Sequence, residues 1–187
     1  MPTITLDLPT RAILSLAHHN AQDALKRFVL LNGDVEGATL SFRLFEDLRQ
    51  LRDPAHNTAI MYHASCFICA VRRVGRLLKS LSDNRTCFRD PVAEVVRLEW
   101  RKKRAFFESF VDPRNAIEHI DNEASDNTRW SFFNLHEERL CVVDGVSVEI
   151  NQRSLDTIVS ARNVVAESIA KEYHDAMFDF LEAATSI

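Results

Sequence analysis

Hydrophobic residues recur at intervals of three and four along most of the chain, which is the spacing of one face of an α-helix. This pattern first covers residues 9–29. Asn32-Gly33 follows, and because both residues tolerate the left-handed backbone conformation common at helix ends, the sequence predicts that the first helix stops there. A second helix is expected over about residues 37–51.

The same spacing predicts three longer helical segments further along the chain. Residues 57–81 include the apolar run MYHASCFICAV, so we expect this helix at the centre of a bundle. Asp90-Pro91 is typical of a helix start, and the helix after it extends towards Phe110. A last long helix is expected over about residues 153–184.

Between these helices the period of the pattern changes from 3.6 to 2. Alternation at residues 130–135 predicts a strand, and RLCVVDGVSVEI predicts two short strands joined at Asp144-Gly145, a frequent two-residue hairpin turn. The sequence therefore predicts a single, mainly α domain over residues 1–187. It would be an antiparallel helical bundle with a small antiparallel β-hairpin insertion at about 130–150, before the last long helix.

The composition suits a reduced, cytoplasmic protein. The chain has four cysteines, too few for a disulfide framework, and it has no apolar run near the roughly 18 residues of a membrane helix. Its first residues show no signal-peptide pattern, so we expect no membrane partner. Cys66-x-x-Cys69 lies in an apolar helix, which favours core cysteines over a redox pair or a zinc site. We expect no cofactor.

Positive charge is concentrated in one part of the chain. Residues 72–104 contain eleven Lys or Arg and four Asp or Glu, a net charge of +7, whereas the whole chain carries -4. The stretch WRKKRAFF mixes cations with aromatic residues, so Arg101, Lys102 and Arg104 are candidates for contacts to an RNA backbone. The alternative is that these cations only solvate exposed helix faces.

A polar cluster follows Asp112-Pro113, which reads as another helix start. If Asp112 is the N-cap, Arg114 and Asn115 occupy the second and third helical positions, where free backbone N–H groups and the helix dipole favour a phosphate. His119 is the residue here that can exchange protons near neutral pH. The alternative is a capped, hydrogen-bonded helix start without chemistry.

The positions of these side chains on a helix suggest a symmetric site. Arg114 and His119 are five residues apart, so they differ by roughly 140° around the axis and about 7.5 Å along it. One helix does not easily direct both at one phosphate, whereas two helices meeting in an isologous dimer could. A metal site from His119 and Glu123 is conceivable but has few ligands, so we expect none.

The stretch RNAIEH, residues 114–119, resembles the Arg-x(4–6)-His signature of the HEPN superfamily, in the form with a polar residue after the arginine. Arg-Asn-x-x-x-His occurs once in the chain. HEPN domains are helical bundles of prokaryotic toxins, antiphage systems and RNA-processing factors, and many are metal-independent endoribonucleases that pair two motifs across a dimer. The predicted hairpin and the net charge of -4 depart from a minimal HEPN nuclease.

The resemblance implies a homodimer that cleaves RNA in a toxin–antitoxin or antiphage-defence setting, with an antitoxin or regulatory protein as a further partner. His119 would act as general acid or base, Arg114 would stabilise the charge on the phosphorane, and Asn115 would orient the phosphate or His119. The alternatives are a non-catalytic HEPN-like module that binds RNA or a protein, and a helical scaffold without a nucleic-acid role.

Overall fold

The computed structural model describes residues 8–51, 53–83, 88, 90–120, 134–136, 139–142 and 146–185. Within these ranges the chain is mainly helical, as the spacing of its apolar residues predicts. The elements are α1 (Leu8–Leu51), the 3-10 turn η1 (Pro54–His56), α2 (Asn57–Asp83), α3 (Asp90–Glu108), α4 (Val111–Ile120), β1 (Asn134–His136), β2 (Arg139–Val142), β3 (Val146–Glu149) and α5 (Gln152–Thr185). No helix in the described part of the chain is long and apolar enough to cross a membrane.

The N-terminal segment forms one helix of 44 residues, so the predicted helix end at Asn32-Gly33 is wrong. Leu31 and Val35 are both fully buried, and they carry the buried stripe of α1 past this pair without interruption. Asn32 also donates a hydrogen bond to Glu36 at 2.7 Å, one helical turn ahead. Packing along the stripe outweighs the roughly 1 kcal/mol by which a glycine disfavours a helix interior.

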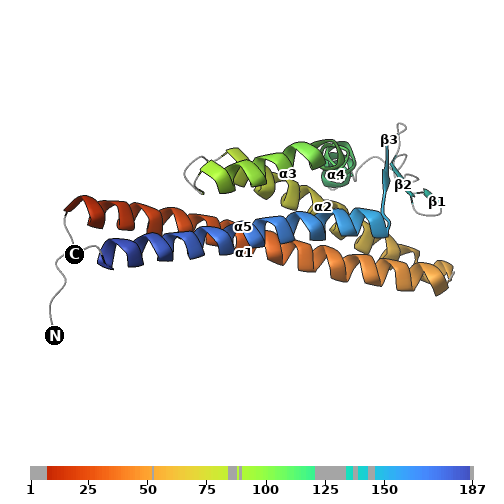
Figure 1. Cartoon of the computed structure of the whole chain (residues 1–187). Helices are drawn as coiled ribbons and strands as arrows, with labels where there is room; N and C mark the ends of the chain where they lie inside the picture. The colour runs from red at the N-terminus through yellow and green to blue at the C-terminus, as the bar shows by residue number, and fades with distance from the viewer. Residues whose placement is uncertain are drawn as a thin grey trace.

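The bundle is built around α2, which packs against α1, α3, α4 and α5. The predictions of a central helix over 57–81 and of a last helix over 153–184 are confirmed, since α2 and α5 extend them by no more than two residues at either end. α1 and α5 lie side by side and antiparallel, and they project beyond the other helices (Figure 1). The core between the helices is rich in phenylalanine, with Phe45, Phe67 and Phe107 each exposed by 1% or less.

Three short strands lie between α4 and α5 and form an antiparallel sheet in the order β1-β2-β3. β2 and β3 pair with Leu140 opposite Val148. Val148 is buried, and Ile150, just past the sheet, is fully buried in the helical core. Asn151 then caps α5, because its side chain accepts a hydrogen bond from the Ser154 amide at 2.9 Å. Residues 130–133 and the predicted turn at Asp144-Gly145 lie outside the described residues.

Close contact between α2 and α3 depends on a glycine. A Cβ atom at Gly75 would lie 2.8 Å from two ring atoms of Phe107, closer than real Cβ contacts allow. The Phe107 ring cannot easily move away, because it is fully buried and packs against Trp100 and Phe106. Gly75 therefore sets how closely the two helices approach.

We expect Gly75→Ala to lower the free energy of unfolding by about 1–2 kcal/mol, because overpacking outweighs the better helix propensity of alanine. Gly33→Ala is the matched control, since nothing lies within 4 Å of its Cβ position. That change should raise the free energy of unfolding by about 0.5–1 kcal/mol. Urea denaturation measures the free energy of unfolding of both variants. If both variants changed it in the same direction, the close contact between Gly75 and Phe107 would be contradicted.

Candidate nucleic-acid interface

A shallow basic groove lies between the C-terminal half of α2 and the middle of α3. It consists of two hollows of about 240 and 350 Å³ that share Asp83 and Trp100, so they form one continuous surface. We call it the α2–α3 groove. Its lining residues are Arg72, Gly75, Arg76, Lys79, Ser80, Ser82, Asp83, Arg97, Trp100 and Arg101. Five of these are cations and one is a carboxylate, which gives the groove a net positive charge.

The α2 side of the groove is a stripe of three cations. Arg72, Arg76 and Lys79 are spaced i, i+4 and i+7, which places them on one face of the helix. The neighbouring Arg73 lies on another face and pairs with Asp34 of α1, with 2.6 Å between Nε and Oδ1. Arg76 and Lys79 are exposed, and the stripe forms no ion pair with any residue that the structure describes. These charges are therefore free to meet a ligand.

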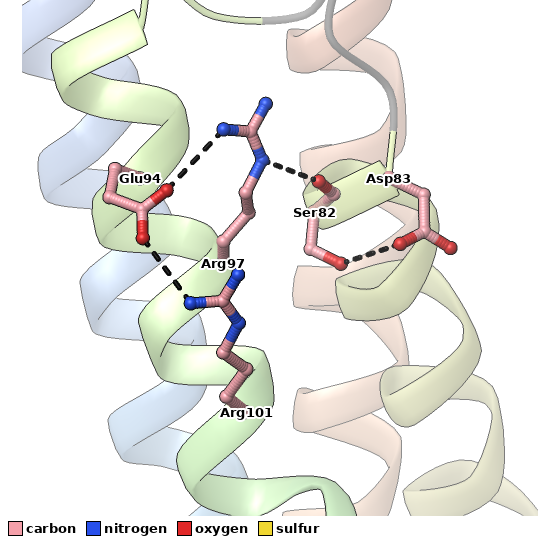
Figure 2. Close-up of polar contacts among 5 residues, drawn as sticks. All are labelled: Ser82, Asp83, Glu94, Arg97 and Arg101. Atoms are coloured by element: carbon pink, nitrogen blue, oxygen red, sulfur yellow. Dashed lines mark hydrogen bonds and ion pairs between the residues drawn. The ribbon is translucent and has the colours of Figure 1, made fainter.

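The α3 side of the groove is held by a small polar network (Figure 2). The Glu94 carboxylate lies 3.4 Å from an Arg97 nitrogen and 3.5 Å from an Arg101 nitrogen. Arg97 Nε also donates to the Ser82 carbonyl at 3.3 Å, at the C-terminal end of α2, where the helix dipole favours a cation. This contact fixes Arg97, whereas the Arg101 side chain is 66% exposed and remains open to solvent.

An aromatic ring lies between the two basic stripes. Trp100 borders both hollows and stacks on Phe107, with 6.0 Å between ring centroids and 17° between ring planes. Phe107 anchors it to the core, so the position of the indole is fixed by packing. Cations beside an aromatic ring are the combination by which many proteins hold single-stranded nucleic acid.

Of the three predicted RNA-binding residues, Arg101 lines the groove, whereas Lys102 and Arg104 lie on exposed surface outside it. Arg104 instead pairs with Glu108 one turn ahead, at 2.6 Å. Arg97 and the α2 stripe were not among the residues predicted from the sequence to form one site. Part of the signal was present in the sequence, because Arg97 and Arg101 on α3 repeat the four-residue spacing of Arg72 and Arg76 on α2.

Lys103 has a structural role that its charged neighbours do not share. Its ammonium lies 2.5 Å from Glu99 Oε1 and donates to Ser160 and to the Thr157 carbonyl, which ties α3 to α5. Glu99 is only 7% exposed, and its Oε1 accepts no well-aligned hydrogen bond from the described residues. The charge of Lys103 is therefore what compensates this buried carboxylate.

We expect Lys103→Ala to lower the free energy of unfolding by about 2 kcal/mol, because it leaves the Glu99 charge uncompensated in a largely buried setting. Lys102→Ala removes the exposed charge of the preceding residue and should change the free energy of unfolding by less than about 0.5 kcal/mol. Thermal or urea unfolding of the two variants provides the comparison. Equal losses would show that the contacts of Lys103 with α5 do not stabilise the fold.

The second candidate site is on α4, and the helix begins earlier than predicted. α4 starts at Val111, and the Arg114 amide donates to the Phe110 carbonyl at 3.3 Å. Asp112 is thus not the N-cap, and the Arg114 amide is used within the helix instead of facing a phosphate. Pro113 explains the break between α3 and α4. It has no N–H to donate to the carbonyl of Ser109, four residues back, so α3 cannot continue as one helix into α4.

The structure brings Arg114 and Asn115 together. Both side chains are half-buried, and an Arg114 guanidinium nitrogen donates to Asn115 Oδ1 at 3.2 Å. The backbone of His119 is in the last turn of α4, but its side chain lies outside the described part of the structure. The meeting of Arg114 with His119 therefore stays a prediction, as do the catalytic roles of these residues.

The apolar sequence around Cys66 and Cys69 predicts that both are buried in the core. In the structure both cysteines on α2 are only half-buried, so this prediction is wrong. Neither Cys66 nor Cys69 forms a disulfide bond with a described residue. A hydrogen bond between Tyr62 and Cys66 raises the pKa of the Tyr62 hydroxyl above its ordinary value of 10.0. Among the described residues, no group of three or more His, Cys, Asp or Glu side chains is placed to hold a metal ion.

Comparison with known proteins assigns no family to the chain, since no protein-family model matches it and no curated protein or solved structure is significantly similar to it. The resemblance of residues 114–119 to the HEPN signature stays a prediction from the sequence.

Proposed function

We propose that the protein binds RNA and that the α2–α3 groove holds its sugar-phosphate backbone. The observation that carries this proposal is that five cations from two helices line one groove around Trp100. Lys and Arg contacts to phosphates supply much of the affinity of proteins for nucleic acids. The net charge of the chain is -4, so attraction for phosphates comes from local basic surfaces such as this groove and not from the protein as a whole.

The shape of the groove favours a single strand. It is shallow and open, so a single strand could lay its phosphates along the two cationic stripes and turn bases towards Trp100. The exposed Arg76 and Arg101 present guanidinium groups, which can each donate two parallel hydrogen bonds to a phosphate. Arg97 is held by Ser82 and Glu94 and would contribute its charge from a fixed position.

The test compares oligomers that differ only in their backbone. Fluorescence anisotropy at about 0.1 M salt should detect binding of a labelled single-stranded RNA of about 20 nucleotides. A peptide nucleic acid of the same sequence has no phosphates and should bind at least about tenfold more weakly. Equal binding of the two would remove the proposal. Equal binding of single-stranded DNA would keep the phosphate-binding groove and remove the preference for RNA.

A second candidate function is metal-independent RNA cleavage at α4. It is supported by the resemblance of residues 114–119 to the HEPN signature and by the hydrogen bond that places Arg114 beside Asn115. In this reaction the 2′-hydroxyl attacks the adjacent phosphate and the 5′-oxygen leaves. His119 would transfer the proton, and Arg114 would stabilise the negative charge on the phosphorane.

Cleavage of a labelled RNA in the presence of EDTA tests this function separately from binding. The wild-type protein should cleave, whereas Arg114→Ala and His119→Ala should lose cleavage and still bind RNA through the groove. Arg104→Ala, which removes an exposed arginine outside both sites, is the control and should cleave normally. Unchanged cleavage in both α4 variants, or none by the wild type, would remove the nuclease function and leave RNA binding as the proposal.

A further inference from the structure

The side of α1 that faces away from the core carries a heptad pattern. Two positions, separated alternately by three and four residues, form a continuous seam along the helix, as in coiled coils. The first position is held by Leu30, Gly37, Leu44 and Leu51, and the second by Lys26, Gly33, Leu40 and Asp47. Leucine and glycine fill the middle of the seam, and opposite charges stand towards its two ends.

Within one copy of the chain the described residues leave this seam uncovered. Leu30, Leu40 and Leu51 are each at least 60% exposed, although they lie on a helix of a packed bundle. Gly33 and Gly37 have nothing within 4 Å of their Cβ positions. The buried residues of α1 lie on the opposite side of the helix, so the seam is not part of the core. An apolar heptad seam in contact with water marks a site of helix association.

We propose that the seam pairs with the same seam of a second copy, with the two α1 helices antiparallel. In an antiparallel pair each first-position residue of the seam faces a second-position residue of the partner. In the register proposed here, Gly37 lies opposite the partner's Leu40, and Gly33 lies opposite the partner's Leu44. By symmetry each of these contacts occurs twice. A large side chain then meets a glycine at four successive layers, so the two backbones can approach closely while the leucines are buried.

Charge on the edge of the seam selects this orientation. Glu36 and Arg43 are exposed, stand seven residues apart on the same edge, and directly precede Gly37 and Leu44. An antiparallel pair brings Glu36 next to the partner's Arg43 on both sides of the two-fold axis. In a parallel pair this edge would meet the opposite edge of the partner, so Glu36 and Arg43 would not face each other. Complementary charges at these flanking positions are what sets orientation in coiled coils.

The size of the surface fits a reversible dimer. The exposed parts of Val29 and the four seam leucines amount to on the order of 500 Å² per copy, or about 1,000 Å² in the pair, near the lower limit for specific interfaces. α1 and α4 lie on opposite edges of the bundle in Figure 1, so this dimer does not join two α4 helices. The proposed dimer does not depend on the proposed RNA binding.

Sedimentation velocity over about 5–200 µM protein tests the interface, since a surface of this size should give a dimer in the micromolar range. The wild type should dimerise, and Leu40→Glu/Leu44→Glu should be monomeric throughout. Val95→Glu/Leu98→Glu is the matched control, because these α3 side chains are 47% and 45% exposed and lie outside the seam. Circular dichroism checks that each variant is folded. A monomeric wild type, or a dimer that survives the seam variant, would overturn the proposal.

A charge exchange tests the antiparallel register. Arg43→Glu places like charges together and should weaken the dimer about tenfold. Glu36→Arg/Arg43→Glu restores opposite charges across the axis and should return the dissociation constant to within about threefold of wild type. Failure of the double variant to recover, with both variants folded, would exclude this register.

Discussion

The double variant Arg76→Glu/Lys79→Glu should bind single-stranded RNA about 100-fold more weakly than the wild type at about 0.1 M salt, since each reversed charge costs on the order of 1.4 kcal/mol beside a phosphate. Both side chains are exposed, line the α2–α3 groove and form no ion pair with any described residue. The fold should therefore be unaffected, and the loss should come from the groove alone.

The matched control for this variant is Arg153→Glu/Lys171→Glu. It changes the net charge by the same amount, and both side chains are exposed on α5, outside the groove. Its RNA affinity should fall by no more than about threefold, through the stronger long-range repulsion between RNA and the negatively charged protein. Equal losses in the two double variants would mean that net charge, and not the groove, governs binding.

Phe67→Ala should lower the free energy of unfolding by about 4 kcal/mol, which is a large part of the stability of a typical domain. Phe67 is fully buried on α2, and its ring lies 5.7 Å from that of Phe42 on α1 and 6.4 Å from that of Phe110 before α4. Its removal leaves a cavity where three parts of the bundle meet, and neither neighbour can fill it without moving its own helix.

Tyr62→Ala is the control for this loss, because Tyr62 is an aromatic residue on the same helix but is 64% exposed. It should change the free energy of unfolding by no more than about 0.5 kcal/mol. Urea denaturation followed by circular dichroism measures both variants. Similar losses for Phe67 and Tyr62 would contradict the position of the core.

The sequence predicted elements best where local pattern and tertiary packing agree. α2 and α5 have long apolar stripes, and Asp90 begins α3 as its Asp-Pro pair indicates. The prediction for the first helix was wrong because Asn32-Gly33 is a local stop signal, whereas the buried stripe of α1 continues through Leu31 and Val35 on both sides of this pair. Local preference of about 1 kcal/mol does not decide such a case.

The candidate sites show a similar limit. The sequence shows that positive charge is concentrated in residues 72–104. It does not show that the basic stripes of α2 and α3 face one groove. That arrangement depends on the contact of Gly75 with Phe107, which joins residues far apart in sequence. Likewise, nothing local distinguishes Lys103, which turns towards α5, from the exposed Lys102. The first position of α4 was misjudged because a proline is also tolerated deeper in the first helical turn.

The most direct test of RNA binding by the α2–α3 groove is the salt dependence of the association constant. For single strands, the slope of log K against log salt concentration is about -0.7 for each phosphate contacted, so four to five contacts predict about -3 for the wild type. Arg76→Glu/Lys79→Glu should reduce this slope to about -1.5, because two contacts are lost. Equal slopes for the two proteins, or wild-type binding that does not change with salt, would contradict the account.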